Sequence, residues 1–309
     1  MITGACGYIG ANLIKVLRNQ GISSIALDNL STGALTRIPE DTLFIKGDIR
    51  DSHVLRDIFK EYQISTVINL AGLKSPNESF DRPGEYFEVN AAAVKLLLEQ
   101  SKRFGVSAFI QSSSSSVYGN SKGERFFENS KRRPISPYGE SKKMAEQYLS
   151  QILAGSSTRG ISLRYFNVVG ALDKSLQDFS NFNLFPKTIE GIKRSESPVI
   201  FGTDYPTPDG TCIRDYIHVG DLVEGHILVA KKIIQSELPS ALNLGLGRGY
   251  SVREIIELIV SEMNMKTEVI EMGRRNGDPA IAIADTSLFE SLFEWRPKFS
   301  LMDMVRTSI

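Results

Sequence analysis

The chain has 309 residues, of which 41% are hydrophobic and 23% charged, a composition typical of a soluble globular protein with one large or two smaller domains. The 36 basic residues balance the 36 acidic ones, so net charge points neither to nucleic acid nor to an anionic membrane as a partner. Cys6 and Cys212 fit neither a disulfide framework nor a metal site, so we expect no metal and a reducing, cytoplasmic location. No stretch is apolar enough to cross a bilayer, and the glycine turn at Gly4 predicts no signal peptide.

The first half of the chain alternates short apolar runs with helical patterns. The apolar runs are β-branched and nearly continuous, as in strands buried on both faces, and they cover 24–28, 43–46, 66–71, 106–112 and 161–166. Helices are predicted at 8–20, 52–62, 90–104 and 137–153, with Gly21 and Gly105 at two of the helix ends. This alternation predicts an α/β fold of the Rossmann type, a doubly wound parallel sheet with helices on both faces.

The second half has more loops. Strands are predicted at 199–201, 241–244 and 266–271, and helices at 221–235 and 251–263, with a capping box between Ser251 and Glu254. Residues 301–308 begin as a helix. We therefore predict a Rossmann domain at 1–170 and a smaller α/β substrate-binding domain at 171–309. Its loops are expected to cover the carboxyl ends of the first sheet, where ligands bind in such folds.

The glycines of residues 3–10 predict a dinucleotide site. Gly4 permits a tight strand-to-helix turn, Gly7 lets a pyrophosphate approach the backbone, and Gly10 lets helix and strand pack closely. The helix that follows offers free N–H groups to the phosphates. Asp28, at the end of the next strand, can accept both ribose hydroxyls and would repel a 2′-phosphate, which favours NAD over NADP. The alternative is a capped turn with a surface aspartate.

A second acidic residue follows the third strand. Asp48 has the position to approach the adenine amine, and a solvated turn aspartate is the alternative interpretation.

Tyr138 and Lys142 are four residues apart on a predicted helix, which puts both side chains on one face. A tyrosine has a pKa of about 10, and bringing it to about 7 takes roughly 4 kcal/mol in favour of the phenolate. A nearby ammonium together with the positive nicotinamide ring can supply that energy. The phenolate then takes the proton of an alcohol while the alcohol carbon gives hydride to the cofactor, and Ser114 holds the same hydroxyl. An ordinary surface pair and a polar strand end are the alternatives.

These residues identify a known family. The chain resembles the extended branch of the short-chain dehydrogenase/reductases, the NAD-dependent epimerase/dehydratase family, and within it the UDP-glucose 4-epimerases. The segments that carry the resemblance are 3–10, 28–29, 47–49, 71–74, 112–114, 138–142, 164–167, 201–211, 214–219, 243–245 and 274–278.

The resemblance implies a role for individual residues. Tyr138 would be the catalytic base, tuned by Lys142 and assisted by Ser114. The residues implied to bind NAD are Gly4, Gly7, Tyr8, Ile9, Gly10, Asp28, Asn29, Asp48, Ile49, Leu70, Ala71, Gly72, Lys74, Asn90, Tyr138, Lys142 and Tyr165. The residues implied to bind a UDP-sugar are Ser114, Asn167, Asn183, Leu184, Phe201, Arg214, Tyr216, Arg275 and Asp278. A guanidinium forks onto phosphate oxygens, so Arg214 and Arg275 suit the diphosphate.

The implied reaction interconverts UDP-galactose and UDP-glucose through a 4-keto sugar, with NAD bound tightly and recycled within each turnover. Related dehydratases carry an Asp-Glu pair where this chain has Ser115 and Ser116, which argues against dehydration. The same chemistry on a UDP-N-acetylhexosamine or a UDP-pentose is an alternative. Ala282 is small at a position that limits substituents on the sugar, which favours tolerance of N-acetyl groups. A non-catalytic protein that binds NAD or a nucleotide sugar is an alternative of another class.

The resemblance also implies a homodimer. In the family, the helices equivalent to 90–104 and 137–153 pair across a two-fold axis. Both segments carry leucine-rich faces here, and such faces are equally suited to pack on the sheet.

Overall fold

The structure is a computed structural model that describes residues 1–120, 125–180, 182–275 and 278–309. The chain forms two compact units, each built from separate stretches of sequence. Unit 1 consists of Met1–Val117, Pro134–Arg164 and Val223–Leu242, and unit 2 consists of Tyr118–Arg133, Tyr165–Leu222 and Asn243–Ile309. No helix among the described residues is long and apolar enough to cross a membrane.

A seven-stranded parallel sheet forms the centre of the Rossmann part and confirms the predicted α/β fold. Its strands lie in the order β10-β6-β5-β4-β1-β2-β3. Their bounds are β1 Ile2–Thr3, β2 Ile25–Asp28, β3 Leu43–Lys46, β4 Thr66–Asn69, β5 Ala108–Ser114, β6 Arg159–Tyr165 and β10 Ala241–Leu244. The order reverses at β1, so β1 and β4 are neighbours, and ligands bind at such a switch point.

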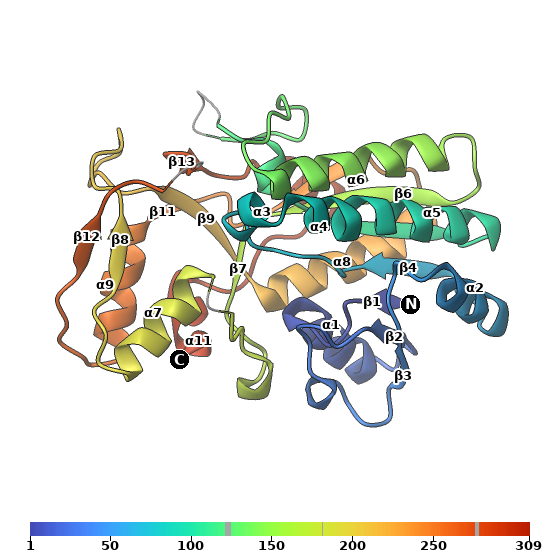
Figure 1. The fold of residues 1–309 in the computed structure, drawn as a ribbon, viewed down its shortest axis with the longest axis horizontal. Coiled ribbons are helices and arrows are strands. Elements are labelled where there is room, and N and C mark those ends of the chain that lie inside the picture. Colours follow the sequence, from blue (N-terminus) through green and yellow to red (C-terminus); the bar gives the residue numbers. More distant parts are fainter. Residues whose placement is uncertain (121–124, 181, 276–277) are drawn as a thin grey trace. The chain divides into compact units, whose positions relative to one another are not determined.

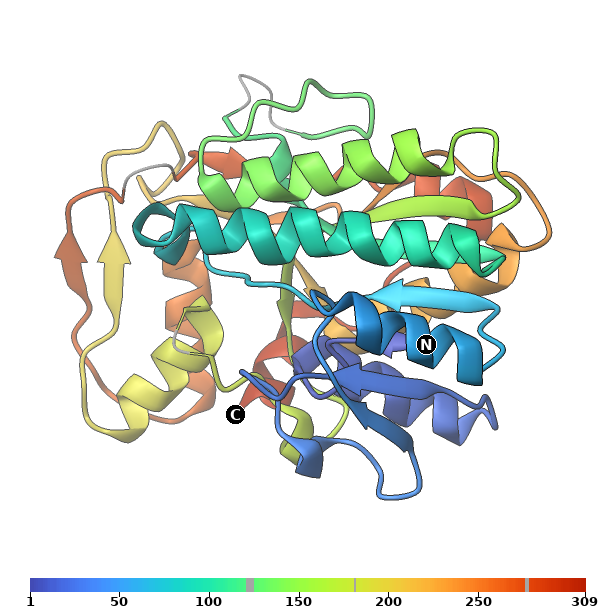
Figure 2. The same cartoon turned by 45° about the vertical axis from the view of Figure 1, so that its right-hand side comes forward.

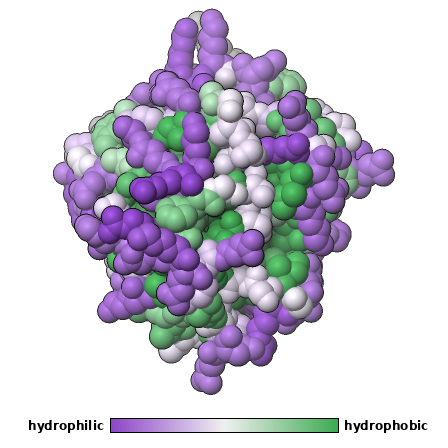
Figure 3. All heavy atoms as spheres, turned by 90° about the vertical axis from the view of Figure 1, so that its right-hand side faces the viewer, coloured by the Kyte–Doolittle hydropathy of each residue, from purple (hydrophilic) through white to green (hydrophobic). Residues whose placement is uncertain are grey.

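Helices cover both faces of this sheet (Figures 1 and 2). The helices α2 (Ser52–Glu61), α5 (Ala93–Arg103) and α6 (Pro137–Leu153) pack on one face, and α1 (Tyr8–Asn19) lies on the other. Leucines of α5 and α6 are buried in the core cluster of that first face, so their leucine-rich stripes pack on the sheet. The face of the molecule in Figure 3 carries mostly hydrophilic side chains, with hydrophobic ones in separate small groups.

Shorter elements complete unit 1. They are η1 Leu35–Arg37, α3 Glu78–Asp81, α4 Pro83–Phe87, the π-helical turn η2 Glu88–Ala92 and η3 Ser115–Val117. The helix α8 (Val219–Ile233) belongs in part to each unit.

Unit 2 has its own small sheets. The strands β11 (Gly249–Ser251), β9 (Ile213–His218) and β13 (Ile281–Ala282) form one sheet, and β7 (Asn167–Val169) also pairs with β9. The strand β8 (Val199–Phe201) pairs with β12 (Ile270–Met272). Four helices and a 3-10 turn complete the unit: η4 Lys174–Leu176, α7 Leu184–Lys193, α9 Val252–Glu262, α10 Ser287–Phe293 and α11 Leu301–Ser308.

Most predicted elements agree with the structure to within two residues. Gly21 and Gly105 have positive φ angles of 69° and 70° after their helices, and Ser251 and Glu254 form the predicted capping box. The predicted strand 266–271 is wrong at its start, because β12 pairs only where β8 offers a partner, over Ile270–Met272. The predicted helix 90–104 begins earlier, as the π-helical turn η2.

Candidate active site

The glycine turn has the shape that a pyrophosphate requires. Gly4 has a φ of 64°, and a Cβ there would lie 2.7 Å from the backbone of Leu70 and Ala71 at the end of β4. Gly7 is the N-cap of α1 and provides no side-chain cap, and the first turn of α1 has no acidic residue. A Cβ on Gly10 would overlap the Gly4 carbonyl oxygen. The first turn of α1 is therefore an uncapped, glycine-lined helix end, which fits a bound phosphate.

Asp28 lies beside this turn. It is 7% exposed, and each of its carboxylate oxygens accepts one backbone N–H, from Cys6 at 2.9 Å and from Leu30 at 2.7 Å. Each oxygen keeps a lone pair, so the fixed carboxylate can still accept from two ribose hydroxyls. Burial, followed by the charge of Asp28, raises the pKa of the Cys6 thiol to about 12, so this thiol stays protonated.

Asp48 is held by protein groups. Its carboxylate accepts two hydrogen bonds from the Arg50 guanidinium, at 3.0 and 2.8 Å, and one from the Asn29 amide at 2.7 Å. The Arg50 hydrogen bond is the main cause that lowers the pKa of Asp48 to about 2. Arg50 and Asn29 thus hold the Asp48 carboxylate in place, and the next residue, Ile49, is buried.

The loop after β4 is fixed by Asn90. The Asn90 Oδ1 accepts from the Leu73 N–H at 2.8 Å, and its Nδ2 donates to the Leu73 carbonyl and to the Ser141 hydroxyl. A Cβ on Gly72 would lie 2.8 Å from the Asn90 Oδ1 and 3.4 Å from the Lys142 Nζ. The structure therefore brings Leu70, Ala71 and Gly72 next to the turn and to α6. Lys74 is exposed at the end of this loop.

Tyr138 and Ser114 contact each other. Burial raises the pKa of Tyr138 above its ordinary value, and the neighbouring Ser114 hydroxyl opposes this shift. Tyr138 is 8% exposed, and its ring meets the Tyr86 ring edge-on, with the ring centroids 6.2 Å apart. Ser114 also accepts the Ser116 N–H at 3.2 Å. The protein's own groups thus orient the phenol and leave it protonated at neutral pH.

Lys142 lies one helical turn after Tyr138. Its Nζ donates to the Ser112 carbonyl at 3.1 Å and to the Ser112 hydroxyl at 3.3 Å, and it lies 5.9 Å from the centroid of the Tyr138 ring. Burial lowers the pKa of Lys142 to about 8, and the charge of Glu146 opposes that shift. The ammonium is thus buried, directed and close to the phenol. The structure therefore brings together the three predicted catalytic residues.

Apart from Ser114, which belongs to unit 1, the predicted substrate residues belong to unit 2. Arg214 and Asp278 form an ion pair at 3.4 Å, and the Arg275 guanidinium stacks on the Phe201 ring at 3.7 Å from its centroid. Arg275 is partly buried, which lowers its pKa below the ordinary value without removing its charge. Asn276 and Gly277, which belong to the same sequence motif, lie outside the described residues.

Asn167 and Tyr216 are register partners on β7 and β9. The Asn167 amide donates to the Asp215 carbonyl at 2.8 Å, and Tyr216 is buried against Phe185. Asn183 precedes Leu184 at the start of α7, and its amide donates to Asp178 at 2.5 Å.

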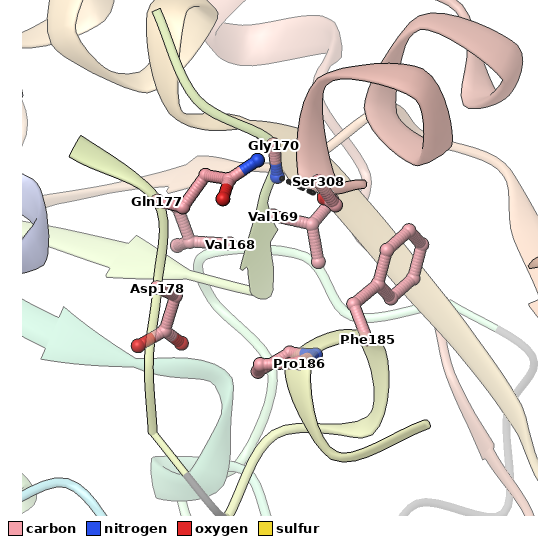
Figure 4. A pocket seen from close by; sticks show the side chains of 8 residues that line it. All are labelled: Val168, Val169, Gly170, Gln177, Asp178, Phe185, Pro186 and Ser308. Atoms are coloured by element: carbon pink, nitrogen blue, oxygen red, sulfur yellow. Dashed lines mark hydrogen bonds between the residues drawn. The ribbon is translucent and has the colours of Figure 1, made fainter. Parts of the chain in front are cut away.

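A small pocket in unit 2 is lined by Asp178, the hydrogen-bond partner of Asn183. Figure 4 shows its lining, which includes Asp178 and Gln177 on one side and Phe185 and Pro186 of α7 on the other. The Gly170 N–H donates to the Ser308 hydroxyl at its rim, at 3.1 Å.

Tyr165 is the last residue of β6 in the seven-stranded sheet, where the chain passes from unit 1 to unit 2. Tyr165 belongs to unit 2, whereas the other residues implied to bind NAD belong to unit 1.

A comparison with known proteins now gives the family. The model of the NAD dependent epimerase/dehydratase family matches residues 1–245. The chain belongs to this family. Its cofactor is NAD, and the glycine turn, Asp28 and the buried Lys142 fit that cofactor.

Relatives of this family member match it over nearly its whole length. A UDP-glucose 4-epimerase of Erwinia amylovora is 38% identical over 99% of this chain and 95% of its own. The structure of a UDP-glucose 4-epimerase from Bifidobacterium longum, in complex with NAD⁺ and UDP, is 34% identical, with a TM-score of 0.92 over 99% of this chain and 96% of that chain. The structure of a UDP-glucose-4-epimerase from Stenotrophomonas maltophila has bound NAD and formylated UDP-arabinopyranose. It is 33% identical, with a TM-score of 0.93 over 99% of this chain and 95% of that chain.

Two buried carboxylates of this epimerase-family chain were not predicted from its sequence. Glu146 pairs with Arg164 beside the catalytic helix, and Asp215 accepts the backbone N–H groups of Leu246, Gly247 and Ala284 at 2.7 to 3.0 Å. Burial raises the pKa of Asp215 to about 7 against these bonds. The sequence does contain a signal for these two carboxylates. Glu146 is four residues after Lys142, and Asp215 lies between the predicted substrate residues Arg214 and Tyr216. Only the fold, however, buries them.

Proposed function

We propose that this protein is a UDP-glucose 4-epimerase that interconverts UDP-galactose and UDP-glucose. The observation that carries the proposal is the Tyr138 phenol beside the Ser114 hydroxyl, one helical turn before the buried Lys142. Such a group moves a proton on and off an alcohol in a dry site, which a protein that only binds nucleotide sugars does not need.

The chain's own residues would carry out the proton chemistry. Tyr138 takes the proton of the C4 hydroxyl, and Ser114 holds that oxygen. Lys142 places its ammonium beside the phenol and favours the phenolate. A bound NAD would supply the hydride acceptor and donor for C4 and a positive ring that adds to the charge favouring the phenolate. The proton of Tyr138 then returns to the same oxygen, so no net oxidation occurs.

Unit 2 would hold the other end of the substrate. Arg214 and Arg275 have the charge and the fork geometry for a diphosphate. The uridine diphosphate site would be completed by other residues of unit 2, namely Asn167, Asn183, Leu184, Phe201, Tyr216 and Asp278. A firmly held diphosphate and a loosely held sugar let the 4-keto sugar turn its other face to the cofactor.

The serines that follow Ser114 favour epimerisation over dehydration. Ser115 and Ser116 form the turn η3 and are partly exposed, and neither can donate or accept a proton as a carboxyl group does at neutral pH. Elimination of water needs an additional acid and base, which this position does not provide.

The experiment is a product analysis with purified protein. Incubation with UDP-galactose is expected to give UDP-glucose and the reverse reaction to give UDP-galactose, without added NAD. No conversion of either sugar by protein that contains NAD would refute the proposal. A UDP-pentose in the same panel tests the alternative with that sugar.

UDP-N-acetylhexosamines are a second candidate substrate. Ala282 lies directly opposite Arg214 in the pairing of β13 with β9 and is 8% exposed, so the residue next to the proposed diphosphate site has the smallest chiral side chain. A substitution Ala282→Tyr is expected to abolish turnover of UDP-N-acetylgalactosamine and to keep that of UDP-galactose. Equal loss of both activities would contradict this role of Ala282.

Three further features belong to the proposal. A homodimer would form through α5 and α6, whose partly buried Leu96, Tyr148 and Ile152 pack against the core cluster, and light scattering of the purified protein tests it. Residues 1–170 would bind the cofactor, and residues 171–309 would bind the sugar nucleotide.

A cytoplasmic location would keep Cys6 and Cys212, both free thiols, reduced.

A further inference from the structure

Three ionisable residues follow one another along a single stripe of α6. Tyr138, Lys142 and Glu146 are spaced by four residues each, so they lie on the same face of the helix. Each has a partner in the last residues of β5. The Tyr138 phenol lies beside the Ser114 hydroxyl, Lys142 donates to Ser112, and the Ser113 hydroxyl donates to the Glu146 Oε1 at 2.6 Å. The serine tract therefore binds the whole stripe, including a carboxylate for which the reaction has no direct use.

Glu146 is also paired with a cation. The Arg164 guanidinium on β6 donates through Nε to Oε1 at 2.8 Å and through Nη2 to Oε2 at 2.7 Å. Both side chains are only 4% exposed, so the pair is almost completely shielded from water. Removing two charges from water costs free energy that the attraction between them often does not return. Stability alone is therefore a weak reason for this pair.

We propose that Glu146, held in place by Ser113 and Arg164, is a positioning residue that keeps Lys142 charged and directed at Tyr138. This inference rests on the proposed epimerase activity. The carboxylate neutralises the buried Arg164 and places a negative charge one helical turn from the ammonium. Lys142 bonds to Ser112 and Glu146 bonds to Ser113. Two neighbouring residues of β5 therefore hold the two side chains of α6 in place.

The surroundings of Lys142 contain few other charges. The groups that face it or its neighbours on the stripe are Ser112 of β5, Asn90 of η2, Tyr86 of α4, Glu78 of α3, which accepts from Tyr86, and Arg164 of β6. On α5, Lys95 lies over Tyr148 and Lys102 donates to the Ile152 carbonyl, both further along α6 than Glu146. Glu146 is thus the one carboxylate on the stripe next to the ammonium.

The consequence is a dependence on pH. Burial lowers the pKa of Lys142, and Glu146 opposes this shift. Without the carboxylate, Arg164 would remain as an uncompensated cation, which disfavours a second cation nearby and lowers the pKa of Lys142 further. The ammonium would then be lost at a lower pH, and with it the charge that favours the Tyr138 phenolate.

The test compares Glu146→Gln with the unsubstituted enzyme in its NAD-bound form. We expect kcat for UDP-galactose at pH 7.5 to fall about tenfold or more, equivalent to about 1.4 kcal/mol. The basic limb of the kcat profile should move to lower pH, with KM changed by less than about threefold, because the substituted residue does not contact substrate. The double variant Glu146→Gln with Arg164→Met removes both charges and should bring the basic limb back towards its original pH. Glu140→Gln, on the same helix but paired with Lys143 at the surface, is the matched control and should change neither quantity.

Two outcomes decide against the inference. An unchanged pH profile of kcat in folded Glu146→Gln would overturn it, and so would equal effects of Glu146→Gln and Glu140→Gln. If Glu146→Gln does not fold, Ser113→Ala removes one hydrogen bond to Glu146 and keeps the ion pair. We expect it to shift the basic limb in the same direction by a smaller amount, and no shift would again refute the role. Failure of the unsubstituted protein to convert UDP-galactose would instead refute the proposed function.

Discussion

Tyr138→Phe is the most direct test of the catalytic site, because it removes one oxygen and leaves the ring. The ring packs edge-on against Tyr86, so the substituted side chain keeps its packing. The lost hydroxyl lies beside Ser114, and Ser114 still accepts the Ser116 N–H. The expected cost to the free energy of unfolding is therefore small, about 1 kcal/mol.

The effect on turnover should be much larger. Burial raises the pKa of Tyr138 above about 10, so fewer than about one tyrosine in a thousand is ionised at pH 7 from the protein's groups alone. Bringing the pKa to about 7 requires more than about 4 kcal/mol from Lys142 and the bound cofactor. Phenylalanine has no hydroxyl that could ionise and act as a base, and general-base catalysis contributes about 10²- to 10⁴-fold to the rate. We expect kcat to fall by about 10³-fold, or about 4 kcal/mol.

The assay measures conversion of UDP-galactose to UDP-glucose, with NAD content and thermal unfolding as controls. NAD content should equal that of the unsubstituted protein, since the glycine turn and Asp28 are unchanged. A kcat within about tenfold of the original, in protein that holds NAD, would refute the assignment of Tyr138 as the base.

Three further outcomes follow from the cofactor end of unit 1. Asp28→Asn removes the charge that repels a 2′-phosphate, so the ratio of NAD to NADP affinity in fluorescence titrations should fall about tenfold or more; an unchanged ratio would contradict the role of Asp28. Gly10→Ala places a methyl group against the Gly4 carbonyl and should lower the melting temperature markedly, whereas Gly84→Ala, whose Cβ meets nothing within 4 Å, should not. Asp48 has a pKa lowered to about 2, so its contribution to stability is present above the unfolded pKa of about 3.9 and is lost as pH falls through about 2. Asp48→Asn should therefore be less stable than the parent at pH 6 in urea unfolding, and the difference should disappear near pH 2; a constant difference would exclude this linkage.

The sequence predicted regular elements well where local pattern and packing agree. The four helices 8–20, 52–62, 90–104 and 137–153 all exist, because each has an apolar stripe and an end marked by glycine, aspartate, serine or proline. Elements of unit 2 were harder to predict. The sequence pattern does not predict the strand β9, because its residues Arg214 and Asp215 interrupt the apolar run.

The π-helical turn at Glu88–Ala92 has no signal in residue pattern alone. It accompanies the Asn90 side chain, which bonds to the Leu73 backbone and so depends on a loop distant in sequence. Fixed loops of this kind are set by pairs of residues that only the fold brings together.

The sequence by itself determined the family, the glycine turn and the identity of the Ser114, Tyr138 and Lys142 group. These depend on residue types at fixed short spacings, which a linear pattern contains in full. Tertiary structure alone decided what surrounds them. Only folding buries Glu146 with Arg164 and sets the serines of β5 against α6. Charges act over a few ångströms through a medium whose polarity depends on burial, and neither quantity is written in the order of residues.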